Sequence, residues 1–284
     1  MNAVVSVANI AFDNVTMDEA IERIVAFACS GNGDPRHVCT GNLDHLVLLQ
    51  NDGEFRRAYE SAALVLADGM PVVWLSRLGR AGALRERVAG SDLFWELARE
   101  SHATGLRLFF LGGAPGAAEG AARAVQSRYP RAQVCGAYCP PASVFDTEEE
   151  QARIAAAVRR SAPDVLLVGL GAPKQEKWIA AHKHLLGVPV SIGVGGTFEM
   201  AAGMVSRAPR WMQHIGLEWS WRLALEPGRL YRRYLARDLP FLLGLTLCTL
   251  AARGAAGAVG PVSEPCTTYA AAPSAAPPTL ESGR

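Results

Sequence analysis

One short unit occurs twice in this chain: an apolar run, a glycine-rich turn and a proline that opens a helical pattern. Residues 106–111 are followed by Gly112-Gly113-Ala114-Pro115, and residues 165–168 by Gly169-Leu170-Gly171-Ala172-Pro173. Continuous apolar runs are typical of buried parallel strands, and we expect the proline of each unit to be the first helical residue. The repeat predicts an α/β fold, a Rossmann-like, mostly parallel and doubly wound sheet with helices on both faces. Its turns aim backbone N–H groups and positive helix ends at the crevice above the sheet.

Other apolar patterns predict the rest of this sheet and its helices. Thr16 and Glu19 form a capping box before an amphipathic stripe that ends near Cys29, which predicts a helix. A third glycine turn, residues 191–196, ends a strand predicted over 188–192. The remaining strands are predicted at residues 4–7, 37–39 and 64–67, and the remaining helices after residue 42 through 49, at 52–61, 70–78 and 174–182, from about 91 onward, and up to about 128.

The composition changes beyond Gly203. Residues 207–237 carry seven arginines interleaved with tryptophans and tyrosines, and Pro227-Gly228 should separate two helices there. From residue 254 the chain is dominated by Ala, Gly, Pro, Ser and Thr, which cannot bury enough apolar surface to order itself. We therefore predict a core over 1–203, a basic and aromatic helical appendage over 204–253, and a disordered tail over 254–284.

An apolar segment closes the appendage. Residues 239–252 are interrupted by Pro240 and bounded by Arg237 and Arg253, so no stretch is expected to reach the roughly 20 apolar residues of a membrane-spanning helix. The segment is long enough to lie in the interface of a membrane. The alternative is a buried helix of the domain or a dimer interface.

Charge and cysteine usage exclude little. The net charge is +1, which favours no nucleic-acid partner. The six cysteines show neither Cys-x-x-Cys nor zinc-type spacing with histidine, as expected of thiols in a reducing compartment. The first ten residues lack a basic region before an apolar core, so we expect a cytoplasmic protein.

Asp68 is the candidate catalytic base. It follows an apolar run, residues 64–67, and Gly69 and Pro71 then turn the chain. Ligands of open α/β sheets bind at the carboxyl ends of the strands, where a lone carboxylate is placed to take a proton. The alternative is that Asp68 caps the following helix.

Two further stretches carry polar candidates. Thr40 and Asn42 follow another predicted strand, and their alternative role is a plain helix cap. Arg87 precedes Gly90 and a helix start, so its guanidinium and the helix N-terminus could meet one anion. Its alternative is a local ion pair with Asp92.

The helix after the second glycine unit opens with an amide and charged residues. Gln175 is a candidate to hold a sugar hydroxyl or a uracil edge. Glu176 and Lys177 are expected on an ordinary exposed first turn.

Some common motifs do not occur in the sequence. It has no Gly-x-Gly-x-x-Gly and no Walker pattern, so a nucleotide-dependent dehydrogenase is weakly supported. It also has no Asp-x-Asp, the paired carboxylates that often clamp a metal on a diphosphate. Arginines and helix N-termini would then have to meet the charge of a diphosphate.

Gathered together, the motifs resemble the WecG/TagA/CpsF glycosyltransferase family. They occur in the family's order between about residues 4 and 237: Thr40-Gly41-Asn42, Ala67-Asp68-Gly69-Met70-Pro71, Arg87-Val88-Ala89-Gly90-Ser91-Asp92, Gly171-Ala172-Pro173-Lys174-Gln175-Glu176, Gly193-Val194-Gly195-Gly196-Thr197-Phe198, and Arg207-Ala208-Pro209 through Gly216-Leu217-Glu218-Trp219 to Arg233-Tyr234.

The resemblance implies an inverting β-glycosyltransferase of cell-surface or extracellular polysaccharide synthesis. It would move N-acetylmannosamine or a related hexose from a UDP-sugar to a polyprenyl-diphosphate-linked acceptor, without a metal or other cofactor, at the inner face of the cell membrane. The family also allows self-association. A non-catalytic UDP-sugar-binding or scaffold subunit of a polysaccharide assembly complex is the alternative.

By the same resemblance, the candidate residues acquire roles. Asp68 is the general base, Thr40 and Asn42 position donor or acceptor groups, and Arg87 and Gln175 line the donor site. The appendage would close over the pocket and contact the diphosphate through Arg222, Arg229 and Arg232. Two departures, Glu199 where the family often has Asp and His214 where a basic residue is common, leave the details of the donor open.

Overall fold

The computed structural model describes residues 4–30, 33–79, 82–214 and 216–255, except the side chains of residues 210, 214, 229 and 252–255. The predicted tail lies outside the described residues from residue 256 on. The core strands are β1 (Val4–Val7), β2 (Ile10–Asp13), β3 (Arg36–Gly41), β4 (Leu64–Ala67), β5 (Arg107–Gly112), β6 (Gln133–Tyr138), β7 (Val165–Gly169) and β8 (Val190–Gly193). The core helices are α1 (Met17–Cys29), α2 (Leu43–Asn51), α3 (Gly53–Glu60), α4 (Met70–Leu78), α5 (Gly90–Thr104), α6 (Ala117–Arg128), α7 (Glu148–Ser161), α8 (Lys174–Leu186) and α9 (Thr197–Ala201).

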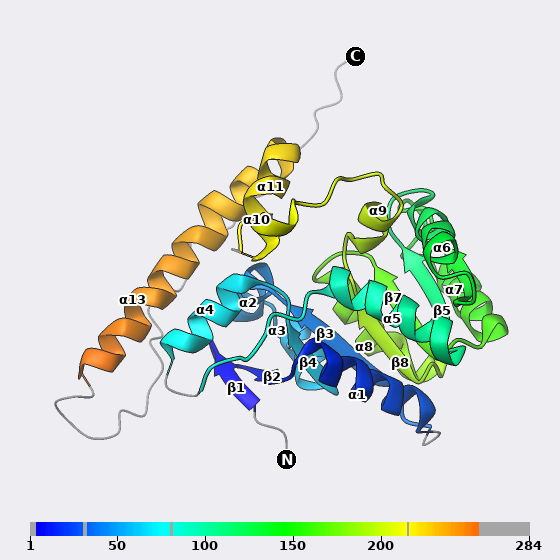
Figure 1. The fold of residues 1–284 in the computed structure, drawn as a ribbon, viewed down its shortest axis with the longest axis horizontal. Helices are drawn as coiled ribbons and strands as arrows, with labels where there is room; N and C mark the ends of the chain where they lie inside the picture. Colours follow the sequence, from blue (N-terminus) through cyan, green and yellow to red (C-terminus); the bar gives the residue numbers. More distant parts are fainter. Residues whose placement is uncertain (1–3, 31–32, 80–81, 215, 256–284) are drawn as a thin grey trace.

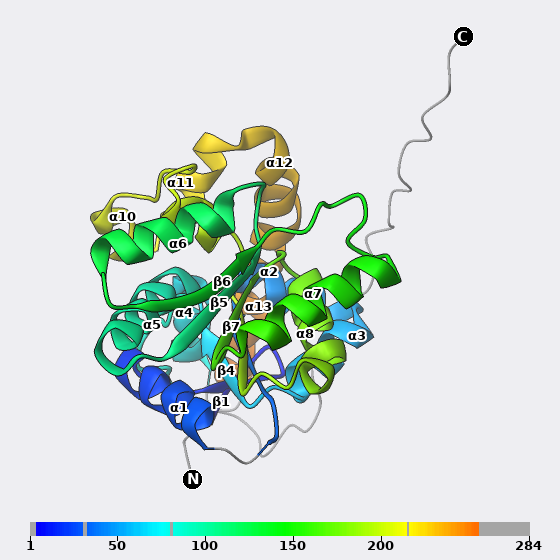
Figure 2. The same ribbon diagram turned by 90° about the vertical axis from the view of Figure 1, so that its right-hand side faces the viewer.

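A six-stranded, wholly parallel sheet forms the centre, in the order β4-β3-β8-β7-β5-β6 (Figure 1). This confirms the predicted α/β class. Alternate side chains of each strand enter different layers, because successive residues of a strand point to opposite faces. Leu108 and Phe110 pack with α1, α5 and α6, whereas Phe109 and Leu111 pack with α7 and α8 on the other face. Figure 2 shows α6 and α7 on opposite sides of β5 and β6.

Four core elements, β2, β6, α7 and α9, are not among the predicted ones. β1 and β2 form a separate antiparallel hairpin. β6 is an edge strand of small and half-buried residues, so it lacks a continuous apolar run, and its Gly136 is required because a Cβ there would lie 2.4 Å from the Phe109 ring. A start signal for α7 was present in Thr147, whose hydroxyl accepts a hydrogen bond from the Glu150 N–H.

The prolines of the repeated unit do not occupy the predicted position. Pro173 is the N-cap of α8, and Pro115 precedes Gly116, the N-cap of α6. The two helices therefore begin one and two residues later than the prolines. The glycine turns still end at helix N-termini. In the turn before α6, Gly116 takes the left-handed conformation (φ +80°) that reverses the chain.

The appendage is helical, as predicted. It contains α10 (Arg210–His214), α11 (Glu218–Leu225), α12 (Pro227–Tyr231), a π-helical segment η1 (Arg232–Asp238) and α13 (Leu239–Ala255). Pro227 opens α12 directly after α11 ends, so the predicted break is confirmed. η1 packs on α2, and α13 runs along the core beside α4 (Figure 1).

Pro240 does not interrupt the C-terminal helix. It lies in the first turn of α13, and α13 continues η1 without a gap. The stretch Arg232–Ala251 is thus a helix of 20 residues that is long and apolar enough, by length and composition alone, to cross a membrane. The prediction that no stretch approaches this length was wrong. Only 6% of it is buried, so the alternative of a buried core helix is not supported.

Candidate functional site

A pocket of about 1050 Å³ lies at the carboxyl ends of the strands, between the core and the appendage. The loops after β3, β4, β5, β7 and β8 form its floor, and residues of α11, α12 and η1 form its roof. Six predicted site residues line it: Thr40, Asn42, Asp68, Arg87, Gln175 and Arg222. Arg232 is exposed and is not part of the lining, and the side chain of Arg229 lies outside the described structure.

Asp68 stands at the end of β4, where its backbone N–H donates to the Gly41 carbonyl at 2.8 Å. It does not cap the following helix: the N-cap of α4 is Gly69, at φ +155°, and no side chain caps that helix. The carboxylate instead faces the start of α5, since a Cβ built on Gly90 would lie 3.6 Å from its Oδ2. The capping alternative for Asp68 was therefore wrong.

The surroundings of Asp68 raise its pKa to about 6. Burial is the largest cause, and the nearby Glu218 carboxylate adds to it, whereas Arg87, Arg222 and a hydrogen bond from the Gly90 N–H lower the pKa. A carboxylate that gives up its proton near pH 6 is both ionised and appreciably basic at neutral pH.

Arg87 makes the local ion pair that was its alternative role. Its Nη2 lies 3.0 Å from Asp92 Oδ2, and its Nη1 lies 3.1 Å from Glu218 Oε2 of α11. A second arginine, Arg207, contacts the same two carboxylates, with Nη1 2.6 Å from Asp92 Oδ1 and Nε 3.5 Å from Glu218 Oε1. We call Arg87, Arg207, Asp92 and Glu218 the arginine–carboxylate cluster. The sequence motifs contained Arg207 and Glu218, but no pattern along the chain indicated that they meet Arg87.

Thr40 and Asn42 line the pocket but also hold its walls. The Thr40 hydroxyl donates to the Gly193 carbonyl at 2.8 Å and so links β3 to β8. Asn42 is the N-cap of α2, and its Oδ1 accepts a hydrogen bond from the His45 N–H at 3.2 Å. The cap alternative is confirmed for Asn42.

Gln175 is 2% exposed and joins two glycine loops of the pocket floor. Its Oε1 accepts hydrogen bonds from the N–H groups of Gly171 at 3.1 Å and Gly195 at 3.0 Å. Its Nε2 donates to Glu176 Oε1 at 2.8 Å. The amide is thus engaged with the protein, and its clearest task in this geometry is to hold the loops after β7 and β8 together.

Glu176 is fully buried, so the prediction of an exposed charged first turn was wrong for it. Burial raises its pKa to about 7, and the hydrogen bond from Gln175 opposes that shift. Lys177 does lie near the surface, where it pairs with Asp52 at 2.7 Å and Glu54 at 3.2 Å. The sequence pattern of the helix did not show that Glu176 is buried and Lys177 is not, because α8 turns Glu176 toward β3 and β8.

Glu199 holds a third glycine loop. Its Oε1 accepts a hydrogen bond from the Ala114 N–H at 2.8 Å, in the turn after β5. Its Oε2 is buried and makes no hydrogen bond within the described residues. Gly169, at the end of β7, leaves no space for a side chain, because a Cβ there would lie 2.8 Å from the Phe198 ring.

The appendage contributes arginines of two kinds. Arg222 lines the pocket, donates to Met200 Sδ at 3.5 Å, and pairs with no carboxylate among the described residues. Arg233 and Arg237 instead pair with Asp44, a carboxylate in the first turn of α2 that is 5% exposed. These two ion pairs fasten η1 to the core and were not predicted.

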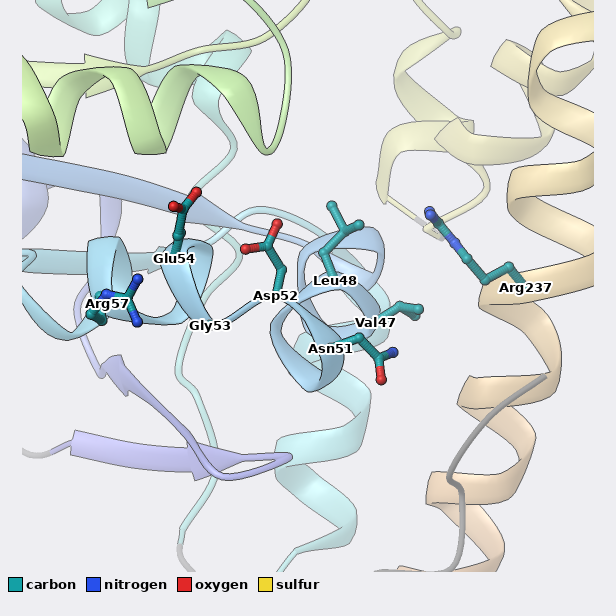
Figure 3. A pocket seen from close by; sticks show the side chains of 8 residues that line it. All are labelled: Val47, Leu48, Asn51, Asp52, Gly53, Glu54, Arg57 and Arg237. Atoms are coloured by element: carbon teal, nitrogen blue, oxygen red, sulfur yellow. The ribbon is translucent and has the colours of Figure 1, made fainter. Parts of the chain in front are cut away.

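A second, smaller cavity of about 540 Å³ lies between α2, α3 and the appendage (Figure 3). Its two carboxylates and Arg237 already have partners, since Lys177 pairs with Asp52 and Glu54, and Arg237 pairs with Asp44. Figure 3 shows Arg237 reaching toward this cavity from the appendage. We therefore take the larger pocket as the candidate active site.

No cluster of three or more His, Cys, Asp or Glu side chains that could hold a metal ion occurs in the described part of the chain. The predicted independence from a metal remains a prediction that only an assay can test.

Known proteins resemble this chain over most of its length. Residues 5–254 match the model of the family described as "Glycosyl transferase WecG/TagA/CpsF family". A relative from Bacillus subtilis (strain 168), an N-acetylglucosaminyldiphosphoundecaprenol N-acetyl-beta-D-mannosaminyltransferase, is 35% identical over 178 residues, which are 63% of this chain and 67% of the relative. A relative of the same name from Staphylococcus aureus (strain NCTC 8325 / PS 47) is 29% identical over 231 residues, 81% of this chain and 88% of the relative.

Proposed function

Since the chain belongs to the WecG/TagA/CpsF glycosyltransferase family and is therefore a glycosyltransferase, we propose the reaction that its pocket performs. It transfers N-acetylmannosamine or a related hexose from a UDP-sugar to a polyprenyl-diphosphate-linked acceptor, with inversion at the anomeric carbon. The names of the relatives support the transferred sugar and the lipid-linked acceptor. The observation that carries the proposal is a carboxylate of raised pKa, Asp68, in a pocket lined with arginines.

In the proposed reaction, Asp68 accepts the proton of the acceptor hydroxyl. The hydroxyl oxygen forms a bond to the anomeric carbon while the bond from that carbon to the diphosphate oxygen breaks, and UDP leaves with the electron pair. A base with a pKa of about 6 is mostly unprotonated at neutral pH and still attracts a proton in the transition state. General-base catalysis of this kind contributes about 10²- to 10⁴-fold in rate.

The charge that develops on UDP needs stabilising groups. Arg87 and Arg222 line the pocket, and both lie close enough to Asp68 to lower its pKa. The N-terminus of α5 also faces the pocket at Gly90 and adds positive potential. We propose that these groups do the work of a metal clamp, so that transfer proceeds in excess EDTA. Activity that EDTA abolishes and Mg²⁺ or Mn²⁺ restores would contradict this part.

To use a lipid-linked acceptor, the enzyme must reach the membrane surface. An apolar stripe of α13 is exposed, with Leu243 at 56% and Leu247 at 68%, and Trp211 of α10 is 61% exposed. Arginines of the neighbouring helices favour anionic lipid headgroups. We propose that the appendage attaches the enzyme peripherally to the cytoplasmic face of the membrane.

Membrane attachment can be tested with vesicles of anionic lipid. Truncation after Tyr234 should leave the protein in the supernatant, and the double variant Leu243→Glu/Leu247→Glu should reduce co-sedimentation without removing pocket residues. Extraction at alkaline pH separates peripheral attachment from a helix that crosses the bilayer. Unchanged partition of both variants would refute the proposed membrane attachment. Chemical cross-linking of the same samples tests the expected self-association.

Transfer itself is tested by incubating the protein with a panel of UDP-sugars and a synthetic prenyl-diphosphate-linked N-acetylglucosamine, followed by mass spectrometry. We expect one donor to give a product whose mass rises by one sugar, and Asp68→Asn to give almost none. The proposed reaction fails if no donor is transferred by folded enzyme supplied with vesicles. A protein that binds UDP-sugar without turnover, and for which Asp68 is dispensable, would instead be a non-catalytic subunit.

A further inference from the structure

The proposed reaction assigns no task to Arg207, the second arginine of the arginine–carboxylate cluster. It lies on the connection between α9 and α10, where the chain passes from the core to the appendage, and it lines the pocket. Its side chain is 23% exposed, so most of the guanidinium is removed from solvent. An arginine in such a place needs acceptors for its five N–H groups.

The protein supplies only part of what this guanidinium needs. Nη1 donates to Asp92 Oδ1 at 2.6 Å, whereas Nε and Nη2 are buried and make no hydrogen bond within the described residues. Nε has only the ion-pair contact with Glu218 Oε1 at 3.5 Å. Buried charged donors without an acceptor are rare in folded proteins, and each calls for an explanation such as a catalytic role, an ordered water or a bound ion. Nε and one Nη of an arginine form an edge that suits two oxygens of a phosphate.

The arginine–carboxylate cluster holds this guanidinium beside that of Arg87. Each carboxylate contacts both arginines through different oxygens: Asp92 uses Oδ1 for Arg207 and Oδ2 for Arg87, and Glu218 uses Oε1 and Oε2 in the same way. Two cations are thus fixed next to each other before any ligand binds. Such preorganisation lowers the entropy that an anion must lose when it bridges them.

We propose that Arg207 is a ligand of the substrate diphosphate, which it binds with its Nε and Nη2 beside Arg87. This inference rests on the proposed function, in which donor and acceptor each carry a diphosphate. A purely structural role is the competing explanation: Arg207 would only tie the connection between core and appendage to Asp92.

Four variants of the full chain separate the two explanations. Arg207→Gln removes the charge and the fork, Arg207→Lys keeps the charge alone, and Asp92→Asn removes one of the two carboxylates that both arginines share. Arg85→Gln is the matched control, because Arg85 pairs with Glu19 on an exposed surface and is not part of the pocket lining. Calorimetry measures binding of UDP and of inorganic pyrophosphate, and thermal melting verifies the fold of each variant.

If Arg207 is a ligand of the diphosphate, Arg207→Gln should weaken binding of the diphosphate that Arg207 contacts, that of the donor or that of the acceptor, by about 10- to 100-fold. Arg207→Lys should retain part of the affinity. Asp92→Asn should weaken binding less than Arg207→Gln does, because it loosens the arrangement of the two arginines but keeps both cations. Arg85→Gln should bind like the wild type. If Arg207→Gln does not fold, the comparison of Arg207→Lys with Asp92→Asn decides in the same way.

Steady-state kinetics then show whether Arg207 binds the diphosphate of the donor or that of the acceptor. A raised KM for the UDP-sugar identifies the donor diphosphate, and a raised KM for the prenyl-diphosphate acceptor with unchanged UDP binding identifies the acceptor diphosphate. Equal losses of affinity and of thermal stability in Arg207→Gln and Asp92→Asn, or unchanged binding and unchanged KM values, overturn the proposal. If UDP binding depends on Arg207 but no sugar is ever transferred, the proposed reaction fails and the diphosphate site stands.

Discussion

Replacement of Asp68 by asparagine should have two opposite effects, a loss of activity and a gain of stability above pH 6. The activity falls because the amide cannot accept the proton of the acceptor hydroxyl, and we expect a loss of about 10²- to 10⁴-fold. The stability rises because burial makes the charged carboxylate unfavourable in the folded protein. An enzyme that keeps such a group sacrifices stability for chemistry.

The size of the stability gain follows from the pKa of Asp68, about 6 in the folded protein against an ordinary 3.8. Between these values the folded protein still binds a proton that the unfolded chain has released, so the wild type loses stability as the pH rises from about 4 to about 6. The full difference corresponds to about 3 kcal/mol. Water in the pocket reaches the half-buried side chain, and we therefore expect a gain of about 1–2 kcal/mol at pH 8 and none near pH 4.

Urea unfolding of the wild type and Asp68→Asn at about pH 8 and pH 4 measures this difference, alongside the transfer rate. Asp34→Asn is the control, since Asp34 precedes the amino end of β3 and its side chain is 56% exposed. The reasoning is refuted if Asp68→Asn transfers sugar at near-normal rates, or if it is less stable than the wild type at pH 8. An equal gain at both pH values would show that the effect does not come from the charge.

Three further outcomes test the site from other sides. The rate kcat/KM should fall about tenfold per pH unit below pH 6, as Asp68 becomes protonated in the free enzyme, and a flat profile down to about pH 4.5 would contradict its role. Gly169→Ala should cost about 1–3 kcal/mol in a urea titration, because the new Cβ would lie 2.8 Å from the Phe198 ring; an unchanged midpoint would mean that the loops can shift. Gln175→Ala should cost about 2 kcal/mol or more and weaken UDP binding by calorimetry, because two buried backbone N–H groups lose their acceptor; wild-type values would show that Gln175 does not hold the loops.

The sequence predicted well those elements that local physics specifies. β4 and α4 have the predicted bounds, because a short apolar run followed by Gly69 and Pro71 leaves the backbone few alternatives. The capping box of Thr16 and Glu19 is present at the start of α1. β6 was missed, since an edge strand with one glycine and half-buried side chains carries no continuous apolar signal.

Partners of charged residues were harder to predict. The alternative that paired Arg87 with Asp92, five residues away, is confirmed, but the second partner of Arg87, Glu218, lies 131 residues further along the chain. Gln175 was a candidate for ligand binding, and only the fold showed that Gly171 and Gly195 already occupy its carbonyl oxygen. Long-range pairs of this kind have no characteristic spacing in the sequence that would predict them, because they depend on which strand ends become neighbours in the fold.

The sequence by itself determined the parallel α/β class, the family, and the position of Asp68 at the end of a strand. Each depends on residues close together in the chain, or on motifs whose order alone carries the information. Tertiary structure decided what surrounds Asp68: burial and Glu218 raise its pKa, and Arg87 and Arg222 come from two distant segments to oppose that shift. The physical reason is that a pKa depends on solvent access and on charges within a few ångströms, and packing alone determines both.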